Sequence, residues 1–354
     1  MLKLQTSAAA FALLWMTSVA HSAAVPGYVQ TTLQTNSSDP DLVNPWGISF
    51  SAGSPFWVSD NGSGKATIYN SAGIKQGLVV SMPAGSFDVD GQVFNGTSSF
   101  HGDSFLFATE DGTITGWRGA LGTNAETLFA VKGAEYKGLA ISPTGSTLYA
   151  TNFATGKIDV FSSTGLTGSF SDPSVPAGYA PFNIEDIDGK LYVTYALRGP
   201  TGDDVAGAGH GFVSVFDPTT HTFSRLVTQG VLNSPWGLAV APANFGGLSN
   251  DLLVGNFGDG TINAFNPLSG SLIGTLAGVS DTPLVDDGLW GLTFGNGGSG
   301  GLVDSLYITA GPNDESGGLF ARIDNVATPE PSTLLLGIAG LAALYFRRCV
   351  LVRG

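Results

Sequence analysis

A pattern of three short apolar stretches recurs six times along this chain and limits its fold more than any other feature. The clearest copy spans residues 233–266. Pro235-Trp236-Gly237 leads into one apolar run there, Leu252-Leu253-Val254 forms a second, and Asp259-Gly260 precedes a third. Asp-Gly between two such runs is a strong hairpin signal, because both turn positions need a positive φ. Each copy is therefore predicted to consist of strands.

The equivalent positions of the six copies are 47, 91, 138, 183, 237 and 291, so the period is 44 to 54 residues. All-strand repeats of this length are typical of β-propellers. We therefore expect an all-β, six-bladed β-propeller over residues 25–327. The sixth copy has only three clear strands, which end near Ile323, and residues 28–35 form a strand without a hairpin partner. We expect residues 28–35 to close the last blade, since this removes an exposed sheet edge.

Composition excludes several classes of function. The net charge is −14 with only 14 Lys and Arg residues, and nucleic-acid binding needs clustered positive charge. The single cysteine, Cys349, excludes a disulfide framework and a cysteine metal site. The four histidines include no close pair, which argues against a His-rich zinc site.

Both ends of the chain differ from the repeats. Residues 1–24 combine Lys3, an apolar run and small residues, which is typical of a cleavable secretory signal. Residues 328–354 contain Pro329-Glu330-Pro331, an apolar run over 334–346 and then Arg347-Arg348. That run has 13 residues, fewer than the ~20 that span a bilayer comfortably. We expect a short transmembrane helix there, with the arginine pair on the cytoplasmic side.

The C-terminal segment resembles the PEP-CTERM sorting signal, which has the same order of motif, apolar helix and basic cluster. The resemblance implies a protein exported by a Gram-negative bacterium, held transiently in the inner membrane and processed by an exosortase. The protein would then reside in the cell envelope or outside the cell, where such proteins are often associated with extracellular polysaccharide. The alternative is a plain tail anchor.

The repeats resemble NHL and gluconolactonase-like six-bladed propellers in layout. They are more similar to an uncharacterised bacterial family of secreted propellers that often carry the same tail. The resemblance rests on strings such as Asn44-Pro45-Trp46-Gly47, Tyr136-Lys137-Gly138 and Asn256-Phe257-Gly258-Asp259-Gly260. It implies a fold and an export route, and no chemistry.

The candidate binding residues follow from the repeat alignment. Trp46, Trp236 and Trp290 occupy one repeat position and should gather at one mouth of the channel, as ligand contacts or as packing residues. The fourth copy departs from the pattern, because Asn183 replaces the repeat glycine and Glu185 follows two residues later. Residues i and i+2 of a strand face the same side, so both are candidates to point into the channel.

A metal site is a further hypothesis. Oxygen ligands suit Ca²⁺ or Mg²⁺, and the predicted hairpin turns of one face supply several of them. The predicted ligands are Glu185, Asn183, Asn152, Asn256 and Asp259. The alternatives are ordinary turn chemistry for the Asn and Asp residues before glycine, and a polar channel lining or bound water for Asn183 and Glu185.

Two functions remain open at this point. The first is an exported, non-enzymatic propeller that acts as a binding or extracellular-matrix module, favoured because no complete catalytic set is present. The second is a divalent-metal-dependent hydrolase or lactonase that uses the channel mouth. Convergence of three or more oxygen side chains at that mouth would favour the second.

Overall fold

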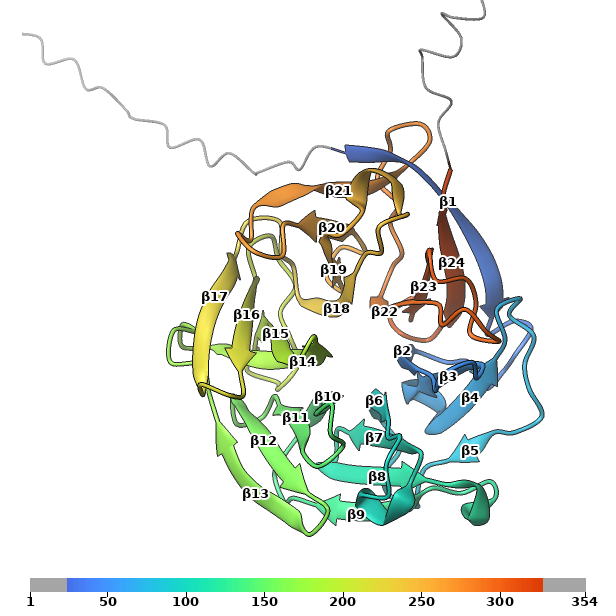
Figure 1. Ribbon diagram of the computed structural model, residues 1–354, viewed down its shortest axis with the longest axis vertical. Helices are drawn as coiled ribbons and strands as arrows, with labels where there is room; N and C mark the ends of the chain where they lie inside the picture. Colours follow the sequence, from blue (N-terminus) through green and yellow to red (C-terminus); the bar gives the residue numbers. More distant parts are fainter. Residues whose placement is uncertain (1–23, 327–354) are drawn as a thin grey trace, which may run out of the picture.

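The computed structural model describes residues 24–326, which form an all-β, propeller-like fold (Figure 1). Four sheets have four strands each, and a fifth has eight. Four short 3₁₀ helices connect strands, and these described residues contain no α-helix. The 3₁₀ helices are η1 (Asn61–Ser63), η2 (Phe100–Gly102), η3 (Gly119–Leu121) and η4 (Gly246–Leu248). The predicted all-β, propeller-like fold is confirmed.

The four-stranded sheets follow the chain in order, and neighbouring strands within each are antiparallel. The first two consist of β2 (Pro45–Ser49), β3 (Phe56–Asp60), β4 (Lys65–Tyr69) and β5 (Val80–Ser81), and of β6 (Val89–Phe94), β7 (Phe105–Thr109), β8 (Thr113–Trp117) and β9 (Glu126–Ala130). The next two consist of β10 (Tyr136–Ile141), β11 (Leu148–Asn152), β12 (Lys157–Ser162) and β13 (Gly165–Phe170), and of β14 (Tyr179–Ile187), β15 (Lys190–Leu197), β16 (Gly211–Asp217) and β17 (Thr222–Thr228).

The eight-stranded sheet has the order β18-β19-β20-β21-β1-β24-β23-β22. Its strands are β18 (Pro235–Val240), β19 (Leu252–Asn256), β20 (Ile262–Phe265), β21 (Leu272–Gly278), β1 (Ala24–Thr35), β24 (Leu319–Asn325), β23 (Ser305–Ala310) and β22 (Leu289–Phe294). Its two edge strands, β18 and β22, lie against each other. The sheet therefore curls back on itself, so that both of its edges lie beside the central axis.

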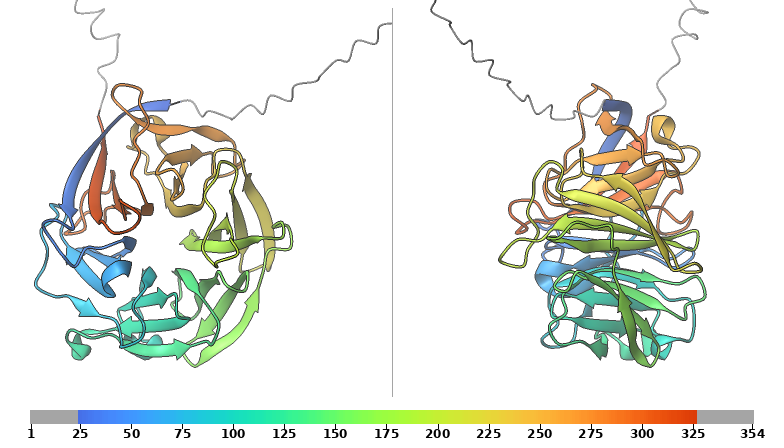
Figure 2. Two further views of the ribbon diagram at one scale, coloured as in Figure 1. Left: turned by 180° about the vertical axis from the view of Figure 1, so that it is seen from behind. Right: turned by 90° about the vertical axis from the view of Figure 1, so that its left-hand side faces the viewer.

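The inner strands of the sheets form a ring around that axis (Figures 1 and 2), and their mutual contacts make it a ring of six strands. β2 lies against β6 and β22, β10 against β6 and β14, and β18 against β14 and β22. The repeat glycines are explained by this convergence, because a Cβ on Gly237 would lie 2.5 Å from the carbonyl oxygen of Trp290. A Cβ on Gly47 would lie 2.6 Å from the carbonyl oxygen of Asp90. Only glycine lets the neighbouring backbones come so close.

The N-terminal strand β1 joins the two halves of the eight-stranded sheet. It pairs antiparallel with β24, from Tyr28 opposite Asn325 to Thr35 opposite Leu319, which confirms the predicted pairing of residues 28–35. Its first residues also pair in parallel with β21, which the sequence pattern did not predict. Val326 donates a 2.7 Å hydrogen bond to the carbonyl of Gly27, so both ends of the described chain lie side by side.

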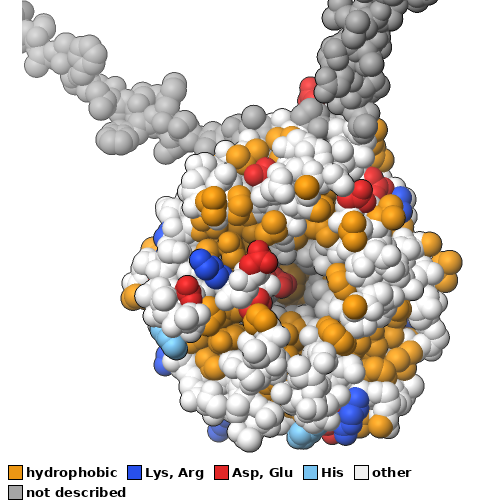
Figure 3. Space-filling model, in the orientation of Figure 1, with side chains coloured by type: hydrophobic (Ala, Val, Ile, Leu, Met, Phe, Trp, Pro, Cys, Tyr) orange, Lys and Arg blue, Asp and Glu red, His pale blue; other side chains and the backbone are white. Residues whose placement is uncertain are grey.

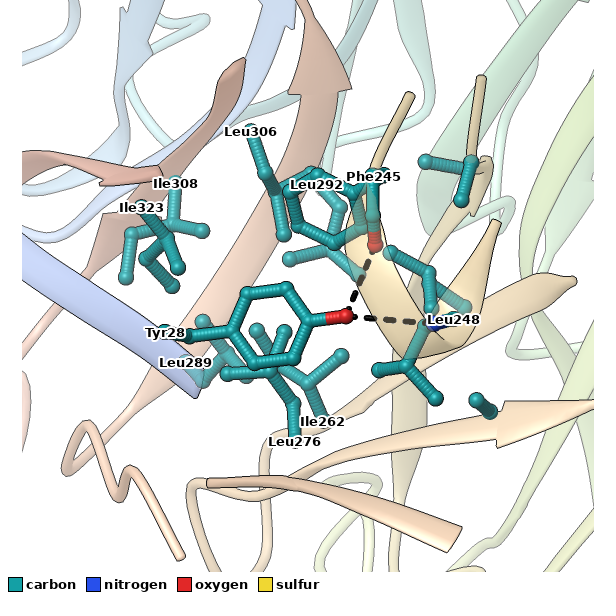
Figure 4. Close-up of a cluster of buried hydrophobic side chains, with 14 of the residues drawn as sticks. Tyr28, Phe245, Leu248, Ile262, Leu276, Leu289, Leu292, Leu306, Ile308 and Ile323 are labelled. Atoms are coloured by element: carbon teal, nitrogen blue, oxygen red, sulfur yellow. Dashed lines mark hydrogen bonds between the residues drawn. The ribbon is translucent and has the colours of Figure 1, made fainter. Parts of the chain in front are cut away.

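Tyr28 anchors β1 in the core of the eight-stranded sheet (Figure 4). Its side chain is 1% exposed and packs among aliphatic residues of both halves of that sheet. Its hydroxyl donates a 2.8 Å hydrogen bond to the carbonyl of Phe245 and accepts one of 3.2 Å from the Leu248 amide. The buried hydroxyl is thus fully used, which fixes the position of the strand.

Several predicted features lie outside the described residues. These are the secretory signal except for Ala24, the transmembrane segment 334–346 and the sorting residues Pro329, Glu330, Pro331, Arg347 and Arg348. Between residues 24 and 326, no helix has the length and apolar character needed to cross a membrane.

Candidate binding site at the open end of the channel

Aromatic side chains fill the channel where the inner strands begin, and we call this the closed end. Trp46 stacks on Trp290 with ring centroids 3.3 Å apart. Trp236 meets Trp46 edge-on at 5.6 Å, and Phe182 meets it at 6.2 Å. All four side chains are at most 4% exposed. The three predicted tryptophans do gather at one end, but they pack against one another across the axis and leave little surface for a ligand.

Lys137 occupies the same repeat position as these tryptophans. Its Nζ lies 2.6 Å from Glu110, 3.3 Å from Glu135 and 5.2 Å from the centre of the Trp46 ring. Burial disfavours the charged ammonium, yet the neighbouring carboxylates of Asp90, Glu110 and Glu135 outweigh it and raise the pKa of Lys137. The closed end is therefore sealed by packed rings and by a network of ion pairs around a buried lysine.

The opposite end, where the inner strands finish, contains a cavity of about 440 Å³, and we call it the open end. Figure 3 shows a hollow near the middle of this face, with hydrophobic side chains around it and acidic side chains beside it. All six inner strands or the residues that follow them contribute to the lining, with two or three consecutive residues each. Most lining residues are apolar, and the polar ones are Ser49, Gln92, Glu185, Asp186 and Thr293.

The repeat alignment explains this lining. The second residue after each repeat position lines the cavity in all six copies, as does the third. The second residues are Ser49, Val93, Ala140, Glu185, Ala239 and Thr293, and the third residues are Phe50, Phe94, Ile141, Asp186, Val240 and Phe294. A carboxylate therefore stands in β14 where the other inner strands carry small or uncharged residues.

Glu185 is the chemically distinctive group of the open end. Burial, and secondarily the charge of Asp186, raises the pKa of Glu185 to about 8. Within residues 24–326 no hydrogen bond or ion pair reaches its carboxyl group. Asp186 differs, because its Oδ1 accepts a 3.0 Å hydrogen bond from the Gly189 amide. An unpaired carboxyl at a cavity wall with a shifted pKa is a common property of functional sites.

Asn183 faces the channel interior with Glu185, as the i, i+2 spacing predicts, since both line a small void of about 10 Å³ beneath the cavity. Its side chain already has a hydrogen-bond partner within the protein, however, because Nδ2 donates a 2.9 Å hydrogen bond to the carbonyl of Trp236. Its main-chain amide donates to Thr194 Oγ1 at 2.9 Å. Asn183 therefore joins neighbouring strands and offers little to a ligand.

The structure does not bring the five predicted metal ligands together. Asn152 and Asn256 end β11 and β19 beside the closed end, opposite Glu185 along the strand direction. Asn152 bonds Asp159 at 2.9 Å, and Asn256 bonds the carbonyl of Val231 at 2.8 Å. Asp259 accepts from Thr261 within its own hairpin. These groups satisfy turns and neighbouring segments, so this set does not fit a Ca²⁺ or Mg²⁺ ion.

One group of three potential metal ligands does occur among the described residues, formed by His101, Asp103 and Glu126. Arg118 already supplies a cation to it, since its guanidinium lies 2.7 Å from Asp103 and also contacts Glu126. This group is therefore explained as an ion-pair cluster at the surface.

Sequence reasoning missed two features of the channel. The first is Lys137, whose place at a tryptophan position of the repeat is a signal for an ion pair with a buried lysine. The three phenylalanines of the open end, Phe50, Phe94 and Phe294, share one offset from the repeat glycine. A comparison of the residues three positions after each repeat glycine is enough to reveal these three phenylalanines.

Comparisons with known proteins support the export signal and the fold. Residues 327–348 match the PEP-CTERM protein-sorting motif. The uncharacterized protein R648 of Acanthamoeba polyphaga mimivirus is 32% identical over 287 residues, which span 74% of this chain and 70% of that protein. A solved streptogramin B lyase has a TM-score of 0.53 and 14% identity, over 84% of this chain and 98% of its own. A luciferin-regenerating enzyme has a TM-score of 0.55 and 15% identity, over 85% and 96%. At these identities the two enzymes show a shared fold alone.

Proposed function

This chain belongs to the family of the mimivirus protein R648, and we propose that it is an exported six-bladed β-propeller that binds a small molecule at the open end of its channel. The proposal has three parts, which concern the architecture, the export route and the ligand site. Each rests on different observations and has its own support.

Six blades are supported by the ring of six inner strands and by the order of the eight-stranded sheet. In that sheet, β18 to β21 repeat the arrangement of the four-stranded sheets, and β22 to β24 need one outer strand to match it. β1 takes this place and also touches β21. The sheet then counts as two blades linked by the N-terminal strand, and the ring has no free edge.

Export is supported by the sorting motif over residues 327–348 and by the signal-like residues 1–24. In this proposal the segment 334–346 holds the precursor in the inner membrane until an exosortase acts near Pro329-Glu330-Pro331. Delivery to the envelope or to the polysaccharide matrix follows. The test is a C-terminal tag, which should be lost from the full-length protein in a Gram-negative strain with an exosortase and retained in the exosortase deletion strain. Equal retention in both strains would contradict this route.

The observation that carries the binding function is the cavity of about 440 Å³ on the channel axis. Its volume lies within the range of small-molecule sites, ~300–1,000 Å³, and its mostly apolar wall with a few polar groups is typical of them. The geometry supports binding better than metal-assisted hydrolysis, because Glu185 lies at one end of the channel and three other predicted metal ligands, Asn152, Asn256 and Asp259, lie at the other.

The proposal is tested with the neutral apolar fluorophore N-phenyl-1-naphthylamine and the purified exported protein. We expect saturable binding that is at least tenfold weaker in Thr293→Trp. Thr293 is a half-buried residue of the cavity wall, so an indole at this position would occupy part of the cavity volume. The matched control is Ala84→Trp, which places the same ring at an exposed position outside the cavity and should bind like wild type. Unchanged affinity in a cooperatively folded Thr293→Trp variant would overturn the proposal.

A further inference from the structure

We propose that the ligand of the open end is an organic cation with an apolar body, whose charge is held by Glu185 and Asp186. This inference rests on the proposed binding function and adds the chemical class of the ligand. It is carried by the distribution of charge and of aromatic rings around the cavity.

The ionisable groups of the cavity wall are all acidic and all lie on one strand. Of its 17 lining residues, only Glu185 and Asp186 carry ionisable side chains, both are acidic, and both belong to β14. The segments from the other five inner strands contribute no titratable side chain to the wall. An anionic ligand would therefore meet two acidic groups without a compensating Lys, Arg or His, whereas a cation would meet complementary charge.

The aromatic side chains of the cavity wall lie across the channel from β14. Phe50, Phe94 and Phe294 follow or end β2, β6 and β22, and β2 lies against both of the other two strands. β14 lies against β10 and β18, which places it opposite β2 in the ring of six. The cavity thus has an aromatic wall facing an acidic wall. Aromatic faces attract alkylammonium groups and also bury apolar surface, so this pairing suits a cation that carries an apolar body.

The protonation state of Glu185 couples ligand binding to proton release. Its carboxyl is mostly protonated at neutral pH in the free protein, because burial raises its pKa to about 8. The titratable group whose charge acts on it is the adjacent Asp186, whose pKa is itself raised by burial and by Asp188. A bound cation favours the ionised carboxylate, so binding should release protons at pH 7. A neutral ligand of the same shape would release none.

The test compares phenyltrimethylammonium, whose charge does not depend on pH, with its neutral isostere tert-butylbenzene. Both compete with N-phenyl-1-naphthylamine for the purified protein. At pH 8.5 we expect the cation to bind at least tenfold more tightly than the isostere, and this preference should shrink at pH 6. Glu185→Gln should weaken the cation at least tenfold and leave the isostere within twofold. Asp281→Asn, at an exposed position outside the cavity, is the control and should keep the wild-type preference.

The outcomes separate the two proposals. If the isostere matches the cation in wild type and in Glu185→Gln, the open end binds small molecules and the cation class is wrong. If neither compound displaces the fluorophore, or the fluorophore binds Thr293→Trp as tightly as wild type, binding at the open end fails as well. Calorimetry of the cation at pH 7 in buffers of different ionisation enthalpy should show proton release in wild type and none in Glu185→Gln. Release of equal size in both proteins would contradict the role of Glu185.

Discussion

The side-chain amide of Asn183 donates a 2.9 Å hydrogen bond to the main-chain carbonyl of Trp236 on the neighbouring inner strand. The other five copies carry glycine at this position, and there the backbones approach too closely for a side chain. Between β14 and β18 the amide bridges the two strands instead. The side chain that replaces a glycine thus serves as a structural contact between two repeats.

Asn183→Ala should destabilise the fold by about 1–3 kcal/mol, because the buried carbonyl of Trp236 loses its donor. Urea unfolding at constant pH measures this difference. Gln76→Ala is the matched control, since Gln76 also donates to a main-chain carbonyl but at an exposed site. It should change the free energy of unfolding by less than ~0.5 kcal/mol. Equal effects of both substitutions would show that the Asn183 bond does not stabilise the ring.

Lys137→Met should cost about 3–5 kcal/mol of unfolding free energy, because Asp90, Glu110 and Glu135 would lose their buried cation. The methionine keeps the length and apolar part of the side chain, so the loss reports mainly on charge. Arg322→Met removes the partly exposed ion pair with Asp324 and should cost less than ~1 kcal/mol. A loss of similar size in both variants, measured by urea unfolding, would contradict a sealed ionic closed end.

The fold was largely predictable because its signals are local and repeated. Each hairpin shows its turn residues, and the period of positions 47 to 291 gives the number of units. Even the pairing of residues 28–35 followed from counting strands in the last copy. The parallel contact of Ala24 and Val25 with β21 was not predictable, since no local pattern indicates which neighbouring sheet a free strand end will meet.

The site was predictable only in part. Asn183 and Glu185 stood out as breaks in the repeat, and both do face the channel interior. Which end of the channel would remain open could not be read from the sequence, because it depends on how Trp46, Trp236 and Trp290 pack together across the axis. Asn152, Asn256 and Asp259 resembled metal ligands by type alone, and their turn and backbone bonds use those same atoms.

Tyr28→Phe should destabilise the protein by about 1–3 kcal/mol, because the carbonyl of Phe245 and the amide of Leu248 lose their buried partner. The ring itself remains, so hydrophobic packing is kept. Tyr179→Phe is the control, since the Tyr179 hydroxyl is partly exposed and reaches the Gly209 carbonyl only at 3.5 Å. Thermal and urea unfolding should show little change for Tyr179→Phe. If Tyr28→Phe unfolds like wild type, the anchoring of β1 rests on backbone pairing alone.

Stability should depend on pH through Glu185 in a direction opposite to that of an ion-paired carboxylate. The pKa of Glu185 is about 8 in the folded protein and near 4.5 when unfolded, so between these values the folded state binds more protons. The free energy of unfolding contributed by this group therefore falls as pH rises from about 4.5 to 8. Its slope is at most about 1.4 kcal/mol per pH unit, and smaller here because the side chain is partly exposed to solvent.

Glu185→Gln removes this titration and should become more stable than wild type as the pH is raised from 5 to 9. The two proteins should converge toward the acidic end, where the carboxyl is neutral in both the folded and the unfolded state. Urea unfolding at a series of pH values measures the difference, and other buried carboxylates such as Asp60 and Asp90 cancel because both proteins contain them. Asp281→Asn, at an exposed position outside the cavity, should follow the wild-type profile. Parallel profiles for Glu185→Gln and wild type would mean that Glu185 is solvated at the open end, and its pairing with a bound cation would then release no protons.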